Sequence, residues 1–434
     1  MNRGATGASG VFANRGAAGA SGVFGNQGVS GSPGTGSGAG AAGVNLPALR
    51  SHNAALVLDL LRTAGAAGIS RLELAERTGL TPQAVSKITA RLRADGLATE
   101  AGRRASTGGK PRTVLRLVPE AGHAVGLHLD RDELTAVLCD LTGAVTAERR
   151  APLDLGAGAD AVVEGAADEV SALLGGVSPL GVGVALPGPL DHTLGVLHRV
   201  TGFPEWDGFA LRDALAGRLG LPVVVDKDTN AAALGVAVGT GTASDALSDG
   251  WPVASSGLSP DLSSGGPSGV GSGVGFAGGG GSFAYLHLGT GLGAGLVIGG
   301  AVHRGARTGA GEFGHQVIQL DGPLCECGNR GCIEVLCLDA VGRGAVAEAA
   351  RVLGAGAANL VGLLDIDLVL LGGRTVAAHE DVFVRGVGAV LEERARREGG
   401  VAPVPVRVAP GGARGVAEGA AQLMLAPLFG RGEG

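Results

Sequence analysis

Hydrophobic and polar residues follow regular periods in three stretches of the 434-residue chain. Residues 46–118 have a helical period and end in a short hairpin pattern that contains glycine. Residues 122–238 alternate runs of β-forming residues, such as 124–129, with helical patterns, such as 160–174. Residues 283–430 show the same alternation. Further strands are expected at 134–140, 181–186, 222–225, 284–288, 295–298 and 367–371, and a further helix at 210–219. The pattern predicts an α/β protein with two similar lobes behind a helical N-terminal domain.

Two segments have no such period. Residues 2–13 recur almost letter for letter at 14–25, and glycine, serine and alanine continue to the end of residues 1–45. Residues 239–282 have a similar composition and interrupt the regular pattern. Neither segment offers enough apolar area to offset the entropy of ordering its backbone. We therefore predict a disordered tail at 1–45 and a flexible insertion at 239–282.

Composition and charge narrow the class of protein. Glycine accounts for 83 residues without a collagen period, and the longest uncharged stretch is too rich in glycine and serine for a membrane helix. The first thirty residues lack the apolar core of a secretory signal, so a cytoplasmic protein without membrane contact is expected. Residues 47–118 hold twelve Lys and Arg against five Asp and Glu, whereas the remainder from 119 onward is acidic. This asymmetry favours a nucleic-acid contact confined to the head.

The basic head contains a helix-turn-helix pattern, RLELAERTGLTPQAVSKITA at residues 71–90. Ala75 is small enough for a helix crossing, and Gly79 tolerates the positive φ of a tight turn. Thr81 can cap the second helix and Pro82 suits its first position. Apolar residues Val85, Ile88 and Leu92 are then expected to form one buried stripe.

The remaining positions of the second helix face outward and carry DNA-reading chemistry. Glutamine can bond adenine with two hydrogen bonds, lysine and arginine can reach guanine or phosphate, and alanine can meet a thymine methyl. The alternative is a small helical bundle with solvated charges. Two short strands around a basic loop at 102–118 favour a winged helix-turn-helix, whose wing can lie along phosphates. The predicted DNA-binding residues are Thr81, Gln83, Ala84, Ser86, Lys87, Arg91, Arg103, Arg104 and Lys110.

A metal site is predicted in the third stretch. His315 precedes Cys325, Cys327 and Cys332 in a short segment. One imidazole and three thiolates complete a tetrahedral Zn²⁺ shell without an open position, which is typical of a structural site. The alternative is a set of buried free thiols beside an unrelated histidine. Cys337 and Cys139 have no evident role in this shell and are expected in the core.

The motif G-E-x-G-H followed by C-x-C-G-N-x-G-C-x-E, at residues 311–334, resembles the signature of the ROK family, named for repressors, open reading frames and sugar kinases. The resemblance covers residues 46–430 and includes the winged head that ROK repressors carry and ROK kinases lack. It implies a winged helix-turn-helix head followed by a two-lobed actin-like, or ribonuclease H-like, domain with a cleft between its lobes.

The resemblance also implies a sugar site in the cleft. Asp228 matches the residue that acts in family kinases as general base, here vestigial, and Glu312, His315 and Glu334 match residues that hold sugar hydroxyls. Lys227 stands where the family usually has asparagine. It either pairs with Asp226 or Asp228 or contacts an acidic or phosphorylated ligand, and the sequence leaves both readings open.

The phosphate-binding loop of family kinases, Asp-x-Gly-Gly-Thr, is replaced. His128 takes the place of the aspartate, and Asp130, Arg131 and Asp132 take the places of the glycines and threonine. Three carboxylates at 130–133 would repel a triphosphate, so ATP binding and enzymatic activity are expected to be lost. Arg374, which follows Gly372 and Gly373, stands where the family has a further glycine near the bound nucleotide.

Together these features predict a ROK-type transcriptional regulator, usually a repressor, that binds a double-stranded, near-palindromic operator as a homodimer or a dimer of dimers. A sugar or sugar derivative would be its effector and zinc its cofactor. Two alternatives remain: a sugar kinase with an added DNA-binding head, and an orphan regulator whose cleft binds nothing.

Overall fold

The computed structural model describes residues 52–104, 112–198, 200, 203–239, 281–399 and 402–431, all of which belong to one compact unit. The predicted tail at 1–45 and nearly all of the predicted insertion at 239–282 lie outside the described residues.

The head consists of three helices and a small antiparallel sheet. Its helices are α1 (His52–Thr63), α2 (Arg71–Thr78) and α3 (Pro82–Ala94), and its strands are β1 (Ile69–Ser70), β2 (Ala98–Arg104) and β3 (Arg112–Leu117). The strand order β1-β3-β2 is that of a winged helix-turn-helix. Ser70 and Glu73 form a capping box, which fixes the start of α2 because each side chain accepts from the other residue's backbone N–H.

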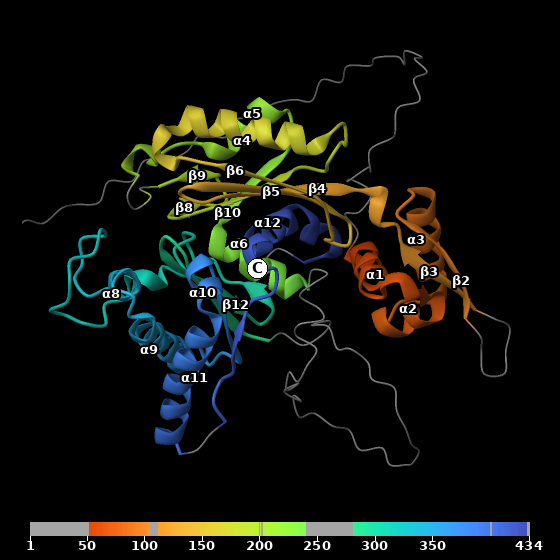
Figure 1. Cartoon of the computed structure of the whole chain (residues 1–434). Helices are drawn as coiled ribbons and strands as arrows, with labels where there is room; N and C mark the ends of the chain where they lie inside the picture. The colour runs from red at the N-terminus through yellow and green to blue at the C-terminus, as the bar shows by residue number, and fades with distance from the viewer. Residues whose placement is uncertain are drawn as a thin grey trace, which may run out of the picture. The chain divides into compact units, whose positions relative to one another are not determined.

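The first lobe is built on a five-stranded sheet in the order β10-β7-β4-β5-β6. Its strands are β4 (His123–Leu129), β5 (Glu133–Asp140), β6 (Val145–Pro152), β7 (Val182–Leu186) and β10 (Val223–Lys227), with a separate small pair β8 (Leu190–Asp191) and β9 (Val196–Leu197). Helices α4 (Ala159–Leu174) and α5 (Leu211–Leu219) cover one face of the sheet (Figure 1). These elements confirm the alternation predicted for residues 122–238.

The second lobe repeats this plan with a five-stranded sheet in the order β13-β12-β11-β14-β15. Its strands are β11 (Phe283–Leu288), β12 (Leu292–Ile298), β13 (Ala301–Val302), β14 (Leu368–Gly372) and β15 (Val406–Val408). Its helices are α8 (Ile333–Gly342), α9 (Val346–Leu364), α10 (Arg374–Ala378) and α11 (Glu380–Arg397). In the described part of the chain only α9 is long and apolar enough to cross a membrane, and it packs instead against α8 and α11.

Two helices lie between the sheets of the lobes, α6 (Asp228–Val238) and α12 (Gly415–Leu425). Every residue of α6 from Thr229 to Val238 is buried. The close approach depends on glycines in both sheets. A Cβ at Gly126 would lie 1.9 Å from the Ala417 carbonyl oxygen of α12, and one at Gly295 would lie 2.0 Å from the Thr229 carbonyl oxygen of α6. These helices therefore couple the lobes directly.

Gly126→Ala is accordingly expected to destabilise the protein by about 1–3 kcal/mol, because the new methyl group cannot fit without moving α12. Thermal unfolding measures the effect. The matched control is Gly165→Ala in α4, where an added Cβ meets nothing within 4 Å. That change should stabilise the helix by about 0.5–1 kcal/mol. If both variants changed the thermal stability in the same direction, the close packing of Gly126 against α12 would be contradicted.

The head is joined to the body at two places. The first is the short connection at 119–122, where a 3-10 turn, Pro119–Ala121, leads into β4. The second is a contact that the sequence did not indicate: Arg62 of α1 donates to the Val238 carbonyl oxygen at the end of α6, at 3.1 Å. Arg62 also pairs with Asp59, which in turn pairs with Arg431. One hydrophobic cluster, which includes Leu58 of the head and Phe429 of the body, continues across this junction.

Candidate functional site

The helix-turn-helix forms as its sequence predicts, with one correction. Gly79 has φ of 69° in the turn, and the Thr81 hydroxyl accepts from the Ala84 N–H at 3.3 Å as the N-cap of α3. Val85 and Leu92 are buried and Ile88 packs against the same cluster, but Ile88 is only half-buried, so the predicted stripe forms and is less buried at that position than expected. Thr89 is fully buried instead. Its hydroxyl can occupy this apolar position because it donates to the Val85 carbonyl oxygen at 2.8 Å.

The predicted reading residues of α3 lie on its accessible side. Thr81, Gln83, Ser86, Lys87 and Arg91 are exposed, whereas Ala84 is half-buried. The wing is present as the β2–β3 hairpin, in which the backbones of Arg103 and Arg104 pair with Thr113 and Arg112. The side chains of Arg103 and Arg104, and all of Lys110, lie outside the described residues.

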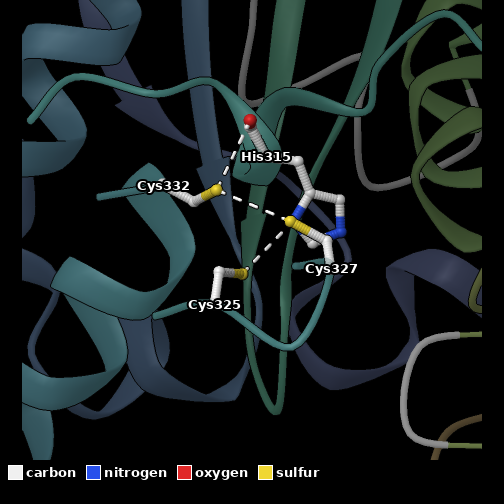
Figure 2. Close-up of side chains that lie close together, drawn as sticks. All are labelled: His315, Cys325, Cys327 and Cys332. Carbon is white, nitrogen blue, oxygen red and sulfur yellow. Dashed lines mark hydrogen bonds between the residues drawn. The ribbon is translucent and has the colours of Figure 1, made fainter. Parts of the chain in front are cut away.

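The four predicted metal ligands come together at the start of α8, as Figure 2 shows. The ligand atoms of His315, Cys325, Cys327 and Cys332 all lie within 4.8 Å of one another. The Cys327 and Cys332 sulfurs are 3.6 Å apart, and the Cys325 sulfur is 3.8 Å from His315 Nδ1. Zn–S bonds of about 2.3 Å in a tetrahedron place neighbouring ligand atoms roughly 3.8 Å apart. The donor set and its spacing therefore fit zinc.

The other two cysteines lie in the core, as expected. Cys139 and Cys337 are fully buried, and the Cys337 thiol donates to the Ala349 carbonyl oxygen. Burial raises the pKa of both thiols to about 12, so neither is a thiolate at neutral pH. The described cysteines are thus of two kinds: three belong to the cluster of metal ligands, and two are unreactive thiols in the core.

The predicted sugar residues line one cavity of about 80 Å³ between the lobes, which we call the effector cavity. Asp228 at the start of α6, Glu312, His315 and Glu334 all border it. Burial raises the pKa of Asp228. Glu334 accepts from the Leu292 N–H at 2.8 Å, which fixes one of its oxygens against the β11–β12 hairpin. The structure therefore brings Asp228 of lobe 1 together with three residues of one lobe 2 segment, Glu312, His315 and Glu334.

Lys227 adopts neither of the pairings expected from the sequence. Its ammonium group donates to Glu312 Oε1 at 3.0 Å and to the Ala310 carbonyl oxygen, and its side chain is only 3% exposed. Asp226 pairs instead with Arg304 at 2.7 Å, because its carboxylate faces lobe 2. Lys227 thus holds Glu312 in position within the effector cavity.

The replaced phosphate loop is held by an ion-pair cluster. Arg374 of α10 donates to both Asp130 and Asp132, the latter at 2.8 Å, and Thr290 of the β11–β12 hairpin donates to Asp130 at 3.2 Å. Burial is the largest single influence on Asp130 and opposes its ionisation, but the Arg374 hydrogen bond, the Arg131 backbone N–H and the nearby positive charge together lower the pKa of that carboxyl. The same guanidinium lowers the pKa of Asp132. Two of the three carboxylates at 130–133, those of Asp130 and Asp132, are therefore paired with Arg374 across the cleft.

Sequence comparisons agree with these domains. The ROK family profile matches residues 124–247 and 274–341, and a winged helix-turn-helix DNA-binding profile matches residues 57–99. The xylose repressor of Caldicellulosiruptor bescii is 25% identical over 372 residues, covering 75% of this chain and 84% of that protein. The DNA-binding transcriptional dual regulator NagC of Escherichia coli K12 is 28% identical over 302 residues, covering 68% of this chain and 64% of NagC.

Solved structures share the fold. A ROK family transcriptional regulator, a homologue of the E. coli MLC protein, matches with a TM-score of 0.64 at 20% identity, covering 87% of this chain and 97% of that chain. A ROK family glucokinase from Streptomyces griseus, in complex with glucose and AMPPNP, matches with a TM-score of 0.54 at 22% identity. The match covers 70% of this chain and 99% of that chain. These likenesses show the fold that sugar kinases of this kind share, here behind an N-terminal winged helix-turn-helix. This chain belongs to the ROK family, and its N-terminal domain is a winged helix-turn-helix.

Proposed function

We propose that the chain is a cytoplasmic transcriptional repressor that binds a double-stranded operator through α3 and the wing. In this proposal a sugar or sugar derivative in the effector cavity releases the DNA. The proposal rests on one observation: the same chain has exposed side chains on α3 that can contact bases and a polar cavity between its lobes. The cavity is bordered by Asp228, Glu312, His315 and Glu334. Relatives named as a xylose repressor and as a transcriptional dual regulator support the regulatory role.

The effector cavity suits a polyol because carboxylates and imidazole accept or share several hydrogen bonds with hydroxyl groups. Residues Cys325, Cys327 and Cys332 with His315 would hold Zn²⁺ as a structural ion, which would order the loop that carries Glu312 and the start of α8 that carries Glu334. With Nδ1 of His315 turned toward Cys325, its other ring nitrogen is left for the effector.

The effector test is a thermal-shift measurement with D-xylose, N-acetylglucosamine and D-glucose, followed by operator binding with whichever sugar stabilises the protein. Glu312→Gln should weaken the stabilisation because it removes the charge paired with Lys227. If a sugar stabilises the protein but does not change its operator affinity, the cavity does not regulate DNA binding. If none of the three sugars stabilises the protein, the orphan-regulator alternative is favoured.

Kinase activity is the alternative function, supported by the retained Asp228 and by solved kinases of the same fold. We infer that it is absent, because Asp130 and Asp132 occupy the loop that would face a triphosphate and Arg374 of α10 is already paired with both. The test is an ATP-dependent phosphorylation assay on the same three sugars. Phosphoryl transfer that is lost in Asp228→Asn would establish the kinase instead.

If the protein recognises its operator as a homodimer or a dimer of dimers, variants of base-contacting residues and of phosphate-contacting residues should have different effects on binding. Gln83→Ala is expected to relax base preference at one operator position, worth about 1–3 kcal/mol, because a base-edge contact is lost. Arg104→Ala should weaken binding to all sequences and reduce the salt slope by about one unit, because a phosphate contact is lost. Titrations of operator and scrambled DNA at several salt concentrations measure both effects.

The matched control for charge is Arg385→Ala on α11, whose side chain is 74% exposed and forms a surface ion pair with Asp381. It lies in lobe 2 and should leave affinity and salt slope unchanged. If Gln83→Ala and Arg104→Ala behave alike, α3 does not read bases in the way proposed.

A further inference from the structure

A cavity of about 210 Å³ lies where the body meets the head, and we call it the junction cavity. It is bounded by the C-terminal end of α6, by the turn between β12 and β13, and by the residues that follow α12. Arg62 of the head donates to the Val238 carbonyl oxygen at its edge. Leu234, Ala237, Val238 and Val302 give it apolar walls, and no carboxylate is among the described residues that line it. Its volume is below the roughly 300–1,000 Å³ of most small-molecule sites, so an occupant would be small.

Two arginines with unused hydrogen-bond donors line this cavity, Arg304 and Arg431. Arg304 donates to Asp226 through Nε, and its two terminal nitrogens make no hydrogen bond within the described residues. Arg431 donates to Asp59 through Nε and Nη2, which leaves Nη1 without a partner there. None of these three nitrogens is a buried atom. Since the two terminal nitrogens of a guanidinium group match the two oxygens of a carboxylate, Arg304 can bind a carboxylate with two parallel hydrogen bonds.

The carboxylates that pair with the arginines at this junction do not balance their charge. Arg62 and Arg431 share one carboxylate, that of Asp59, at 2.8 and 2.7 Å, while Arg304 pairs with Asp226 at 2.7 Å. Three guanidinium groups thus face two carboxylates, and one positive charge is left over. The side chains of Arg304 and Arg431 are 11% and 26% exposed, so water screens this charge only in part. The junction cavity therefore favours a ligand with a single negative charge.

We propose that the junction cavity binds a small organic monoanion, a carboxylate with an apolar body. The carboxylate accepts hydrogen bonds from both terminal nitrogens of Arg304 and from Nη1 of Arg431, and the apolar body packs against Leu234 and Val302. The apolar walls disfavour an inorganic anion, which would lose its hydration there without compensation. Because Arg431 also pairs with Asp59 of the head, the bound carboxylate stabilises the attachment of the head to the body. This inference does not depend on the effector cavity or on DNA binding.

The test is calorimetric titration of the full chain with three probes: benzoate, benzamide as an uncharged molecule of the same shape, and inorganic phosphate as an anion without an apolar body. Benzoate is expected to bind in the low millimolar range or more tightly, and the other two should bind about tenfold more weakly than benzoate or not at all. Benzoate should also raise the midpoint of thermal unfolding. No binding of benzoate at about 10 mM, or equal binding of benzamide or of phosphate, would overturn the proposal.

Two variants of the arginines test the contacts while each carboxylate keeps a cationic partner. Arg304→Lys retains a positive charge beside Asp226 but lacks the paired terminal nitrogens, and Arg431→Gln leaves Asp59 paired with Arg62. Each should weaken benzoate binding about tenfold or more, because a charge-assisted hydrogen bond is lost. The matched control is Arg385→Gln at an exposed arginine of α11, which should bind benzoate as the unaltered protein does.

A third variant tests the location without altering a buried residue. Ala301 and Ala378 are both exposed, and only Ala301 borders the junction cavity. Ala301→Trp should abolish benzoate binding by filling the cavity, whereas Ala378→Trp should leave it unchanged. Benzoate binding that survives both Ala301→Trp and Arg304→Lys would place the ligand elsewhere and refute the assignment.

Discussion

Cys332→Ser is expected to remove zinc from the protein and to lower its thermal midpoint by on the order of 10 °C, corresponding to about 4 kcal/mol. Cys332 is fully buried at the N-cap of α8, and its sulfur lies 3.6 Å from that of Cys327. Loss of one of four ligands would leave the remaining thiolates unable to close the shell. Because His315 and Glu334 belong to the same segment, the proposed sugar binding should also be lost, while α3, which belongs to the head and contributes no residue to that segment, should still bind DNA.

Metal analysis and thermal unfolding, performed on freshly purified protein, measure these effects. The matched control is Cys337→Ser, at a buried cysteine of the same helix that lies outside the ligand cluster. It should retain one zinc per chain. A protein that contains no zinc before mutation, or a Cys332→Ser variant that keeps a full equivalent, would show that the cluster is not a zinc site.

The sequence could predict the parts of the molecule whose constraints are local. The helix-turn-helix needs a positive φ at Gly79 and a cap at Thr81, and both requirements are met within a few residues. The metal ligands occupy residues 315–332, so their spacing alone limits how they can meet. The period of apolar residues likewise indicated both lobes, because sheets and helices that cover them impose that period wherever they occur.

Contacts between distant segments could not be predicted in the same way. Arg374 and Asp130 are 244 positions apart, and Lys227 and Glu312 are 85 apart. Which carboxylate an arginine or lysine meets depends on which strand ends the fold places together. Sequence reasoning therefore foresaw the carboxylates of the phosphate loop but not the arginine that pairs with them. The missed burial of Thr89 has a smaller cause, a side-chain hydrogen bond that the apolar pattern does not encode.

The same limit applies to the link between the effector cavity and the head. Helix α6 begins at Asp228, which borders the cavity, and ends at Val238, whose carbonyl oxygen accepts from Arg62 of the head. Because α6 is buried between the lobes from Thr229 to Val238, a displacement at one end must be transmitted to the other or absorbed by its neighbours. Arg62 also lies over the Phe429 ring, at 5.1 Å from its centre, next to the end of α12.

Arg62→Met is therefore expected to uncouple the two sites. The free protein should keep its effector affinity and bind operator within a few-fold of normal, because Asp59 retains its partner Arg431. The effect of a stabilising sugar on operator affinity should fall from the 5- to 150-fold typical of allosteric coupling to nearly one. Operator titrations with and without that sugar measure the change, and the reciprocal effect of DNA on sugar affinity must vanish equally. Arg385→Met, at an exposed arginine of α11, controls for the loss of a guanidinium group. If Arg62→Met responds to sugar as the control does, the contact between α6 and α1 is not the route of coupling.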